Sequence, residues 1–514
     1  MLPTNIRWPW SSPRCATSDT EVMVRENILC GQRVRRLTAV AFALFFLIST
    51  SCGVLIPVPV DGDVQVAVDG ADPGDILVLN AGQYKPFTVD KSLTVLGVAG
   101  PVVRARIQTP AITVRADRVT ISGLKVEGMP KDVDAKFSYY METSGRKSSY
   151  ALDMPNAAIL IYGNDVTIEY SKINGAEVGV QAEGAANITL WNDTFQNCDS
   201  GAKLLDCLGG RIEASRFGEC KKYGVCVERS SEISLVGNEA ANISNIGMML
   251  KESSRCLAEG NYFSGNWQGL VLWNSSLCEL RGNEAYRNLY YGILITTSSN
   301  NTVIENLARE TSRDERMQSG MGIALVDNSS HNLVAMNTVE KNLNGLDIAR
   351  GCQFNLICGN DASDNCNGIR LDKNQNNLVY KNNFWRNSHA NAYDNASHNF
   401  WNATVGNYYD DYRGRDDDGD GLGNDAYWIP KGSSCAVDWH PLIEPAGKDI
   451  DLVAAKNDLY VYAVYRPEEK LPYRTENRTI VIGSRPPTTW WLYVPIFTGS
   501  TMDRRVAMAE SAAR

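Results

Sequence analysis

Residues 247–272 read GMMLKESSRCLAEGNYFSGNWQGLVL, and the phrase that opens this stretch, glycine-apolar-variable-apolar, returns at its end. The phrase recurs along the chain at steps of 22 or 23 residues, with one step of 30. Its glycines are Gly179, Gly201, Gly224, Gly247, Gly269, Gly292, Gly322, Gly345 and Gly368. A second column keeps nearly the same steps: Ser171, Asn192, Ser215, Asn238, Asn261, Asn283, Asn306, Asn337, Asn360 and Asn382. Two columns in phase predict a solenoid from Ala158 to about Asn391.

The period also selects the type of solenoid. Each repeat holds two or three short runs with strand-like alternation, and no run shows the i, i+3, i+4 pattern that a helix needs. The sequence therefore predicts an all-β fold, a coil of parallel strands with about 10–13 rungs of 22–23 residues. At a strand spacing of roughly 4.8 Å, such a rod is roughly 50–60 Å long.

The alternation predicts which side chains point inward. The first and third positions after each glycine are apolar: Val180/Ala182, Ala202/Leu204, Val225/Val227, Met248/Leu250, Leu270/Leu272, Ile293/Ile295, Ile323/Leu325, Leu346/Ile348 and Ile369/Leu371. A second inward row lies three residues before the Asn column: Leu235, Ala258, Leu280, Val303, Val334, Ile357 and Val379. The Asn column itself fits a bend, where stacked amides bond from rung to rung.

These repeats resemble the right-handed parallel β-helix of pectin-lyase-like proteins. Within that superfamily the chain is most similar to the NosD-like group, whose repeats are shared by carbohydrate-binding proteins and sugar hydrolases. The closing segment, residues 400–445, carries the most specific likeness: an aromatic Gly-Asn-Tyr stretch, an Asp-Gly-rich loop and an apolar-Pro-Leu end. The resemblance implies a β-helix over residues 61–445, followed by a C-terminal extension, 446–514, of unknown role.

Two insertions and an N-terminal segment lie outside the regular pattern. Residues 129–156 and 309–320 interrupt the rungs, and insertions in solenoids often form the binding face. Residues 1–53 end with a basic cluster, the apolar run Leu37–Ile48 and then small residues, which predicts a secretory signal and export. A short membrane anchor is the alternative, and Cys52 is a candidate lipidation site.

Charge and cysteine content narrow the function classes. The net charge is −9 without long charged runs, which argues against nucleic-acid binding. Cys256 and Cys278 share a column on adjacent rungs, so they are near enough for a disulfide bridge. Their positions in the strand alternation, however, predict that both side chains point into the core, where free thiols pack well.

One outward stripe follows the middle of the first strand of each rung: Gln181, Lys203, Cys226, Met249, Val271, Leu294, Ala324, Asp347 and Arg370. Its centre, the apolar stripe Met249, Val271, Leu294 and Ala324, would form a contiguous exposed patch, which soluble monomers usually avoid. We therefore expect a cover, either the 129–156 insertion, the 446–514 tail, or a second subunit or envelope partner.

Charged residues beside this stripe have two interpretations. Acids and bases alternate on neighbouring rungs, such as Asp206 with Arg229, which favours structural ion pairs. The functional alternative joins Asp327 with Asp347 or Asp372 as general acid and base near Arg370, which requires carboxyl groups about 5–10 Å apart.

Metal ligands are predicted in one loop. Asp416, Asp418 and Asp420 precede Gly421 in the spacing D-x-D-x-D-G, which is typical of calcium loops, and Asp425 is a further candidate ligand. Copper is not expected, because the four histidines, His331, His389, His398 and His440, show no ligand spacing.

The sequence thus favours an exported or surface-associated protein that binds polysaccharide without cleaving it. Tyr139, Tyr140, Tyr150 and Trp273 are candidate sugar-binding residues, because aromatic rings suit the faces of sugars. A polysaccharide lyase, glycoside hydrolase or epimerase, or a structural or adhesive envelope protein, remains the alternative.

Overall fold

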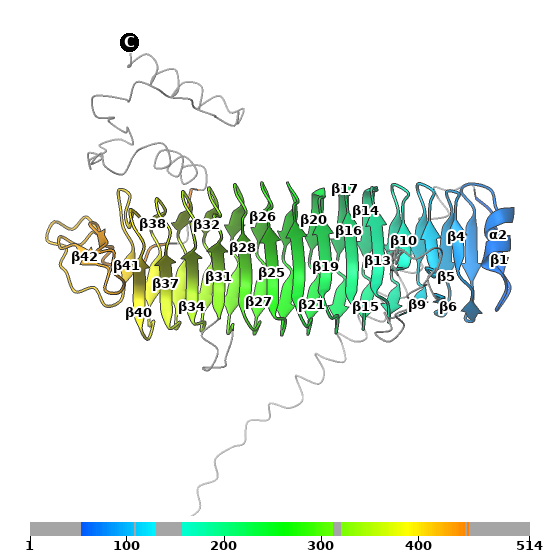
Figure 1. Cartoon of the computed structure of the whole chain (residues 1–514), viewed down its shortest axis with the longest axis horizontal. Coiled ribbons are helices and arrows are strands. Elements are labelled where there is room, and N and C mark those ends of the chain that lie inside the picture. Colours follow the sequence, from blue (N-terminus) through cyan, green and yellow to red (C-terminus); the bar gives the residue numbers. More distant parts are fainter. Residues whose placement is uncertain (1–52, 107–108, 130–156, 312–319, 448–449, 452–514) are drawn as a thin grey trace, which may run out of the picture.

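A computed structural model describes residues 53–106, 109–129, 157–311, 320–447 and 450–451. This part of the chain is a rod of three long parallel sheets, here named A, B and C, wound as one solenoid (Figure 1). In the regular part each rung contributes one strand to sheet C, then one to sheet A and one to sheet B. The parallel solenoid that the repeats predict is confirmed.

Sheet C contains the strand that follows each predicted glycine. Its strands are β4 Phe87–Val89, β7 Ile112–Val114, β10 Ala157–Ile161, β13 Val178–Glu183, β16 Ser200–Leu205, β19 Tyr223–Glu228, β22 Ile246–Lys251, β25 Gln268–Trp273, β28 Tyr291–Thr296, β31 Met321–Val326, β34 Asn344–Ala349, β37 Asn367–Asp372 and β40 Ala390–Asn395.

Sheet A lies next to it along the chain. Its strands are β1 Leu55–Val58, β2 Ile76–Leu79, β5 Thr94–Gly97, β8 Thr120–Ser122, β11 Thr167–Glu169, β14 Ala186–Trp191, β17 Leu208–Glu213, β20 Ser231–Val236, β23 Leu257–Glu259, β26 Glu279–Arg281, β29 Thr302–Ile304, β32 Leu333–Ala335, β35 Leu356–Cys358 and β38 Leu378–Tyr380.

Sheet B closes each rung. Its strands are β3 Gln83–Tyr84, β6 Val102–Arg104, β9 Lys125–Glu127, β12 Lys172–Asn174, β15 Thr194–Gln196, β18 Arg216–Gly218, β21 Glu239–Ala241, β24 Tyr262–Ser264, β27 Glu284–Tyr286, β30 Leu307–Arg309, β33 Thr338–Glu340, β36 Asp361–Ser363, β39 Asn383–Trp385 and β41 Tyr408–Tyr409.

The rod is longer than the sequence predicts. Sheets A, C and B hold 14, 13 and 14 strands, so there are about 14 turns rather than 10–13. The additional turns lie at the N-terminal end, where the glycine column is absent and the strands are short. The first strand, β1, lies before Asp61, the predicted start of the β-helix.

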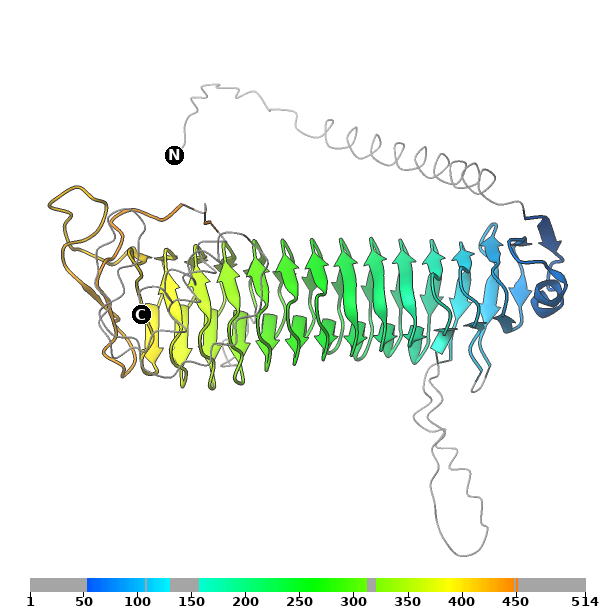
Figure 2. The ribbon, with the colours of Figure 1, turned by 90° about the horizontal axis from the view of Figure 1, so that it is seen from above.

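Both ends of the core are closed. At the N-terminal end, helix α2 Val64–Gly70 begins at Asp63, whose carboxylate accepts the N–H of Gln65, and buries Val64 and Val68. The helix stands at the blue end of the rod in Figure 2. At the other end the hairpin β42 Tyr427–Trp428 and β43 Val437–Asp438 follows the last rung. Covers of this kind hinder the pairing of a sheet edge with another chain.

The predicted core positions are confirmed. Every residue named for the two inward rows is at most 1% exposed. The glycine column has a steric cause, because a Cβ added to Gly269 would lie 2.4 Å from the carbonyl oxygen of Gly292 on the next rung. Other glycines of the column, such as Gly247 below Gly269, meet the same obstacle.

The Asn column forms the predicted ladder of amides. From Asn238 to Asn382, each Asn Oδ1 accepts the backbone N–H of the residue that occupies the column on the previous rung. Where that residue is also an asparagine, the same Oδ1 accepts its side-chain N–H as well. Sequence analysis missed two further ladders at the other corners, which include Asn301–Asn332–Asn355 and Asn342–Asn365–Asn387. The assignment of Asn192 was wrong: Asp193 occupies that position in the column.

Asp193 is a carboxylate inside this ladder. Its Oδ1 accepts the N–H of Ser171 at 2.8 Å, but its buried Oδ2 has no hydrogen-bond partner in the described structure. Burial raises the pKa of Asp193 well above its usual value, although the bond from Ser171 opposes the rise. Asp193 therefore makes its full contribution to the free energy of unfolding below about pH 4, where its side chain is protonated, and this contribution is lost as the pH rises above that value.

Asp193→Asn is expected to stabilise the fold. The new amide N–H would reach a carbonyl of the previous rung, as Asn238 does with Ile212 at 2.8 Å. We expect a gain of about 1–3 kcal/mol at pH 8, the usual cost of an unpaired buried polar group, and a smaller gain near pH 4. Chemical denaturation at both pH values measures the gain in stability. A gain that does not change with pH would contradict the raised pKa of Asp193.

Other sequence predictions concern the cysteines and the chain ends. Cys256 and Cys278 are buried free thiols, as their parity predicts. No helix among the described residues is both long and apolar enough to cross a membrane. The signal or anchor in residues 1–52, including Cys52, lies outside the described residues, as do 130–156, 312–319 and 452–514.

Candidate functional site

The outer face of sheet C is the surface that the sequence predicts as functional. Its outward side chains form three rows, set by the pairing of consecutive strands. The first row contains Tyr223, Ile246, Gln268, Tyr291, Met321, Asn344 and Asn367. The middle row is the predicted stripe from Gln181 to Arg370, and the last row contains Glu228, Lys251, Trp273, Thr296, Val326, Ala349 and Asp372. Figure 1 shows these strands side by side along the rod.

The apolar stripe is buried within a single chain. Met249, Val271, Leu294 and Ala324 are 2, 2, 7 and 0% exposed. They form a cluster separate from the main core, and the partly buried side chains of Tyr223, Tyr290 and Met321 pack against it. A second subunit or envelope partner on this stripe stays a prediction, but the bare apolar area that prompted it is not there.

Aromatic rings border the stripe on both sides. Trp267 and Tyr290, just before β25 and β28, stack with ring centroids 5.7 Å apart and planes 5° from parallel. Tyr290 meets Tyr291 edge-on at 4.5 Å. On the opposite edge, Trp273 ends β25, is 48% exposed and lies 5.7 Å from the Lys251 ammonium. Aromatic rings thus lie on both sides of an apolar stripe that neighbouring side chains already cover.

Sequence reasoning found Trp273 but missed the other border. Trp267 and Tyr290 stand two residues before the repeat glycines Gly269 and Gly292, a position at which the other seven repeat glycines have no aromatic residue. That column of aromatic residues was the available signal. Of the other candidate sugar-binding residues, Tyr139, Tyr140 and Tyr150 lie outside the described residues.

Two of the three candidate acids meet at the C-terminal end of the face. Arg370 bridges them, with Nη1 2.9 Å from Oδ1 of Asp347 and Nη2 2.7 Å from Oδ2 of Asp372. Asn344 also donates to Asp347 at 3.2 Å. Asp347 is 2% exposed, and this burial raises its pKa, although the charge of Arg370 opposes the rise.

Asp327 has different partners. Its carboxylate pairs with Arg350 at 2.9 Å and accepts the hydroxyl hydrogen of Thr296 at 3.1 Å. The ion-pair interpretation is supported here and at Asp206, which Arg229 binds with two hydrogen bonds of 2.9 Å. The acids that the structure brings together are therefore Asp347 and Asp372, joined through one arginine.

A shallow hollow of about 420 Å³ lies beside this end of the face. Lys373, Asn374, Gln375 and Asn395 are among the residues that line it. Asn395 also donates to Oδ1 of Asp372 at 3.1 Å, which connects the hollow to the Arg370 cluster. It extends the polar end of the face.

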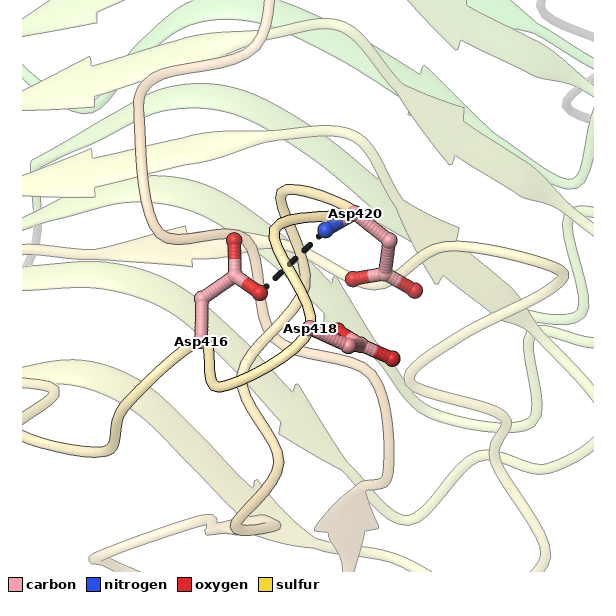
Figure 3. Close-up of side chains that lie close together, drawn as sticks. All are labelled: Asp416, Asp418 and Asp420. Atoms are coloured by element: carbon pink, nitrogen blue, oxygen red, sulfur yellow. Dashed lines mark hydrogen bonds between the residues drawn. The ribbon is translucent and has the colours of Figure 1, made fainter.

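The Asp-rich loop brings three of its four predicted ligands together. One carboxylate oxygen each of Asp416, Asp418 and Asp420 lies within 4.8 Å of the others (Figure 3). Asp416 accepts the N–H groups of Gly419 and Gly421 at 2.7 and 2.9 Å, and hydrogen bonds from this backbone lower its pKa. Asp425 does not belong to this group.

The histidines lie apart from such a group. In the part of the chain that the structure describes, the three aspartates are the one set of three or more His, Cys, Asp or Glu side chains placed to share an ion. The ring of His331 lies 5.4 Å from that of Phe354, and partial desolvation lowers the pKa of this histidine.

Solved structures similar to this chain have low sequence identity to it. No curated protein sequence matches it. Among solved structures it is similar to the mannuronan C-5 epimerase AlgE4 A-module of Azotobacter vinelandii, with 13% identity and a TM-score of 0.47, covering 59% of this chain and 88% of that one. It is also similar to PfbA, a surface adhesin of Streptococcus pneumoniae, with 14% identity and a TM-score of 0.43, covering 56% and 83%.

The family match is more extensive. Residues 137–307 and 249–414 match the family described as "Periplasmic copper-binding protein (NosD)". Together these matches span residues 137–414, more than half of the 514 residues. The chain belongs to the NosD family.

Proposed function

We propose that this protein binds polysaccharide along the outer face of sheet C and does not cleave it. The observation that carries the proposal is the pair of aromatic borders, Trp267 with Tyr290 and Trp273, on either side of the covered apolar stripe. Aromatic rings present large rigid apolar faces with little loss of conformational entropy, which suits the apolar faces of sugar rings. A stack of rungs spaced roughly 4.8 Å apart holds such rings in fixed positions.

The acids on this face favour binding over cleavage. Asp347 is almost fully buried, and the same guanidinium holds both Asp347 and Asp372. A general acid or base must come within hydrogen-bond reach of the substrate. Neither carboxylate is free to do so in this arrangement.

An enzyme is the second candidate, favoured by the raised pKa of Asp347 on a face with a second acid nearby. A lyase or epimerase needs a group that exchanges a proton, and a hydrolase needs a proton donor. Incubation with acidic and neutral polysaccharides distinguishes these reactions. New unsaturated or reducing ends, or a changed sugar configuration, that Asp347→Asn abolishes would replace the binding proposal with an enzymatic one.

Removal of the aromatic borders tests the binding proposal. Trp273→Ala and Tyr290→Ala are each expected to lower the affinity for the bound polysaccharide about tenfold, because a lost aromatic contact of about 1–2 kcal/mol corresponds to that change. Calorimetry or affinity electrophoresis measures it. Trp191→Ala is the matched control, since Trp191 is 37% exposed and ends a strand of sheet A. Equal affinities for all three variants and the unmodified protein would exclude this face.

Calcium binding by the Asp-rich loop stays a prediction. Calcium is expected to raise the unfolding temperature and to give a binding heat, because an ion that binds only the folded state stabilises it. The variant with Asp418→Ala and Asp420→Ala should lose both effects, whereas Asp417→Asn, outside the group, should keep them. Equal heats for the double variant and the unmodified protein would refute the site.

The family description names copper, but no group of three or more side chains among the described residues offers the donors that copper prefers. Copper prefers imidazole and sulfur ligands, whereas the one shared-ion group among the described residues consists of three carboxylates. Hard oxygen donors of this kind suit calcium. We therefore derive no copper chemistry for this chain.

The proposed setting is outside the cytoplasm. The family description reads "Periplasmic", and the basic and apolar segment at residues 33–48 is typical of an export signal. A structural or adhesive role in the envelope is compatible with a binding rod. Cell fractionation that finds the full-length chain in the cytoplasm would contradict export.

A further inference from the structure

We infer that the polysaccharide bound by the outer face of sheet C is neutral rather than a polymer of uronic acids. The inference rests on the proposed function and names its ligand class. It follows from three features of the face: an uncharged centre, charges at both ends that are already paired, and side-chain oxygens that lack a hydrogen-bond donor.

The centre of the face carries no carboxylate, ammonium or guanidinium group. Three consecutive strands, β25, β28 and β31, present only uncharged side chains in their outward positions. These are Gln268, Val271, Trp273, Tyr291, Leu294, Thr296, Met321, Ala324 and Val326. Trp273 ends β25, and Trp267 and Tyr290 come just before β25 and β28, so a sugar stacked on these rings lies beside the uncharged strands. The Lys251 ammonium, 5.7 Å from the centre of the Trp273 ring, is already paired with Glu228.

Cations at the N-terminal end of the face are occupied. Glu228 binds Lys251 at 2.8 Å and Lys203 at 3.6 Å. Arg229, beside them, binds Asp206 and also contacts Glu228 at 3.2 Å. A carboxylate on the ligand would have to share a cation that already has an acidic partner.

At the C-terminal end of the face, the Asp347–Arg370–Asp372 cluster holds one more carboxylate than cations, and Lys373 lies beyond it in the neighbouring hollow. Arg370 is shared by two carboxylates, those of Asp347 and Asp372. This cluster would repel a polymer that carries one carboxylate per sugar. Burying such carboxylates against the uncharged centre would also leave them without partners, which is strongly unfavourable.

Two unpaired acceptors on the first row favour hydroxyl groups. Oε1 of Gln268 and Oδ1 of Asn367 are buried and have no hydrogen-bond donor among the described residues. The Asn367 amide donates to Asn344 at 2.8 Å, which fixes its oxygen as the free acceptor. Both residues are only partly buried, so a rotation of either side chain would bring its oxygen to the surface, where a sugar hydroxyl can donate to it and an ionised carboxylate cannot.

Matched oligosaccharides test the inference. Mannan and mannuronan oligosaccharides of equal length differ in whether carbon six is a hydroxymethyl group or a carboxylate, and glucan and glucuronan form a second pair. We expect the full chain to bind at least one neutral member at least tenfold more tightly than its acidic counterpart. That affinity should change less than twofold between 20 and 500 mM salt, since no charge pair forms on binding.

The outcomes separate the inference from the proposed function. Tight binding of the acidic member that weakens with salt and is lost in Trp273→Ala would overturn the neutral class and keep the binding face. No binding to any member of a broad panel, or binding that is unchanged in Trp273→Ala and Tyr290→Ala, would overturn both. Preference for a neutral member that Trp273→Ala weakens and Trp191→Ala does not would support both.

Discussion

Asn337→Ala is expected to lower the free energy of unfolding by about 3–6 kcal/mol. The side-chain oxygen of Asn337 accepts the backbone and side-chain N–H groups of Asn306, both at 2.9 Å. Its amide donates to the carbonyl of Val303 and to Oδ1 of Asn360, again at 2.9 Å. The residue is fully buried, so its loss leaves several polar groups unpaired, at about 1–3 kcal/mol each.

Chemical denaturation followed by circular dichroism measures this loss. Asn245→Ala is the control, because Asn245 is half-buried and its side chain takes no part in the ladders. It should change the unfolding free energy by well under 1 kcal/mol. Equal losses in the two variants would show that the stacked amides contribute nothing special to the rod.

The repeat pattern predicted the interior of the rod because period and burial are directly linked in a solenoid. Val180 and Ala182 occupy the positions that the glycine column assigns to the core, and so do their counterparts on later rungs. The pattern failed where the columns are imperfect. Asn192 looked like a ladder residue by type, but Asp193 holds the position by geometry, and one residue of offset separates a buried from an exposed side chain.

The candidate site was less predictable, since it depends on how neighbouring side chains cover one another. The strand alternation correctly placed Met249 and Val271 outside the main core. It does not predict that neighbouring side chains on the outer face bury them. The sequence predicted Asp347 one rung from Arg370, which the structure confirms at 2.9 Å. That Arg370 also holds Asp372 depends on the direction of a long side chain, which the repeat does not specify.

Arg370→Met is expected to destabilise the protein by about 3–5 kcal/mol near neutral pH, because it leaves a buried carboxylate without its cation. Asp347 is 2% exposed, and the side chain of Arg370 is itself only 29% exposed. Without the guanidinium the pKa of Asp347 should rise further. A folded-state pKa above the unfolded one means that stability is full below about pH 4 and declines as the pH rises, so the loss should be larger at pH 7 than at pH 4.

Adding Asp347→Asn to Arg370→Met should restore most of the lost stability, since the second substitution removes the unpaired charge. Denaturation midpoints at pH 4 and pH 7 for the single and double variants measure both effects. If Arg370→Met instead keeps the stability of the unmodified protein at both pH values while it abolishes conversion of a polysaccharide, the pair is catalytic. In that case the ion-pair interpretation of this cluster is wrong, because a structural pair so deeply buried cannot be broken from one side without a loss of stability.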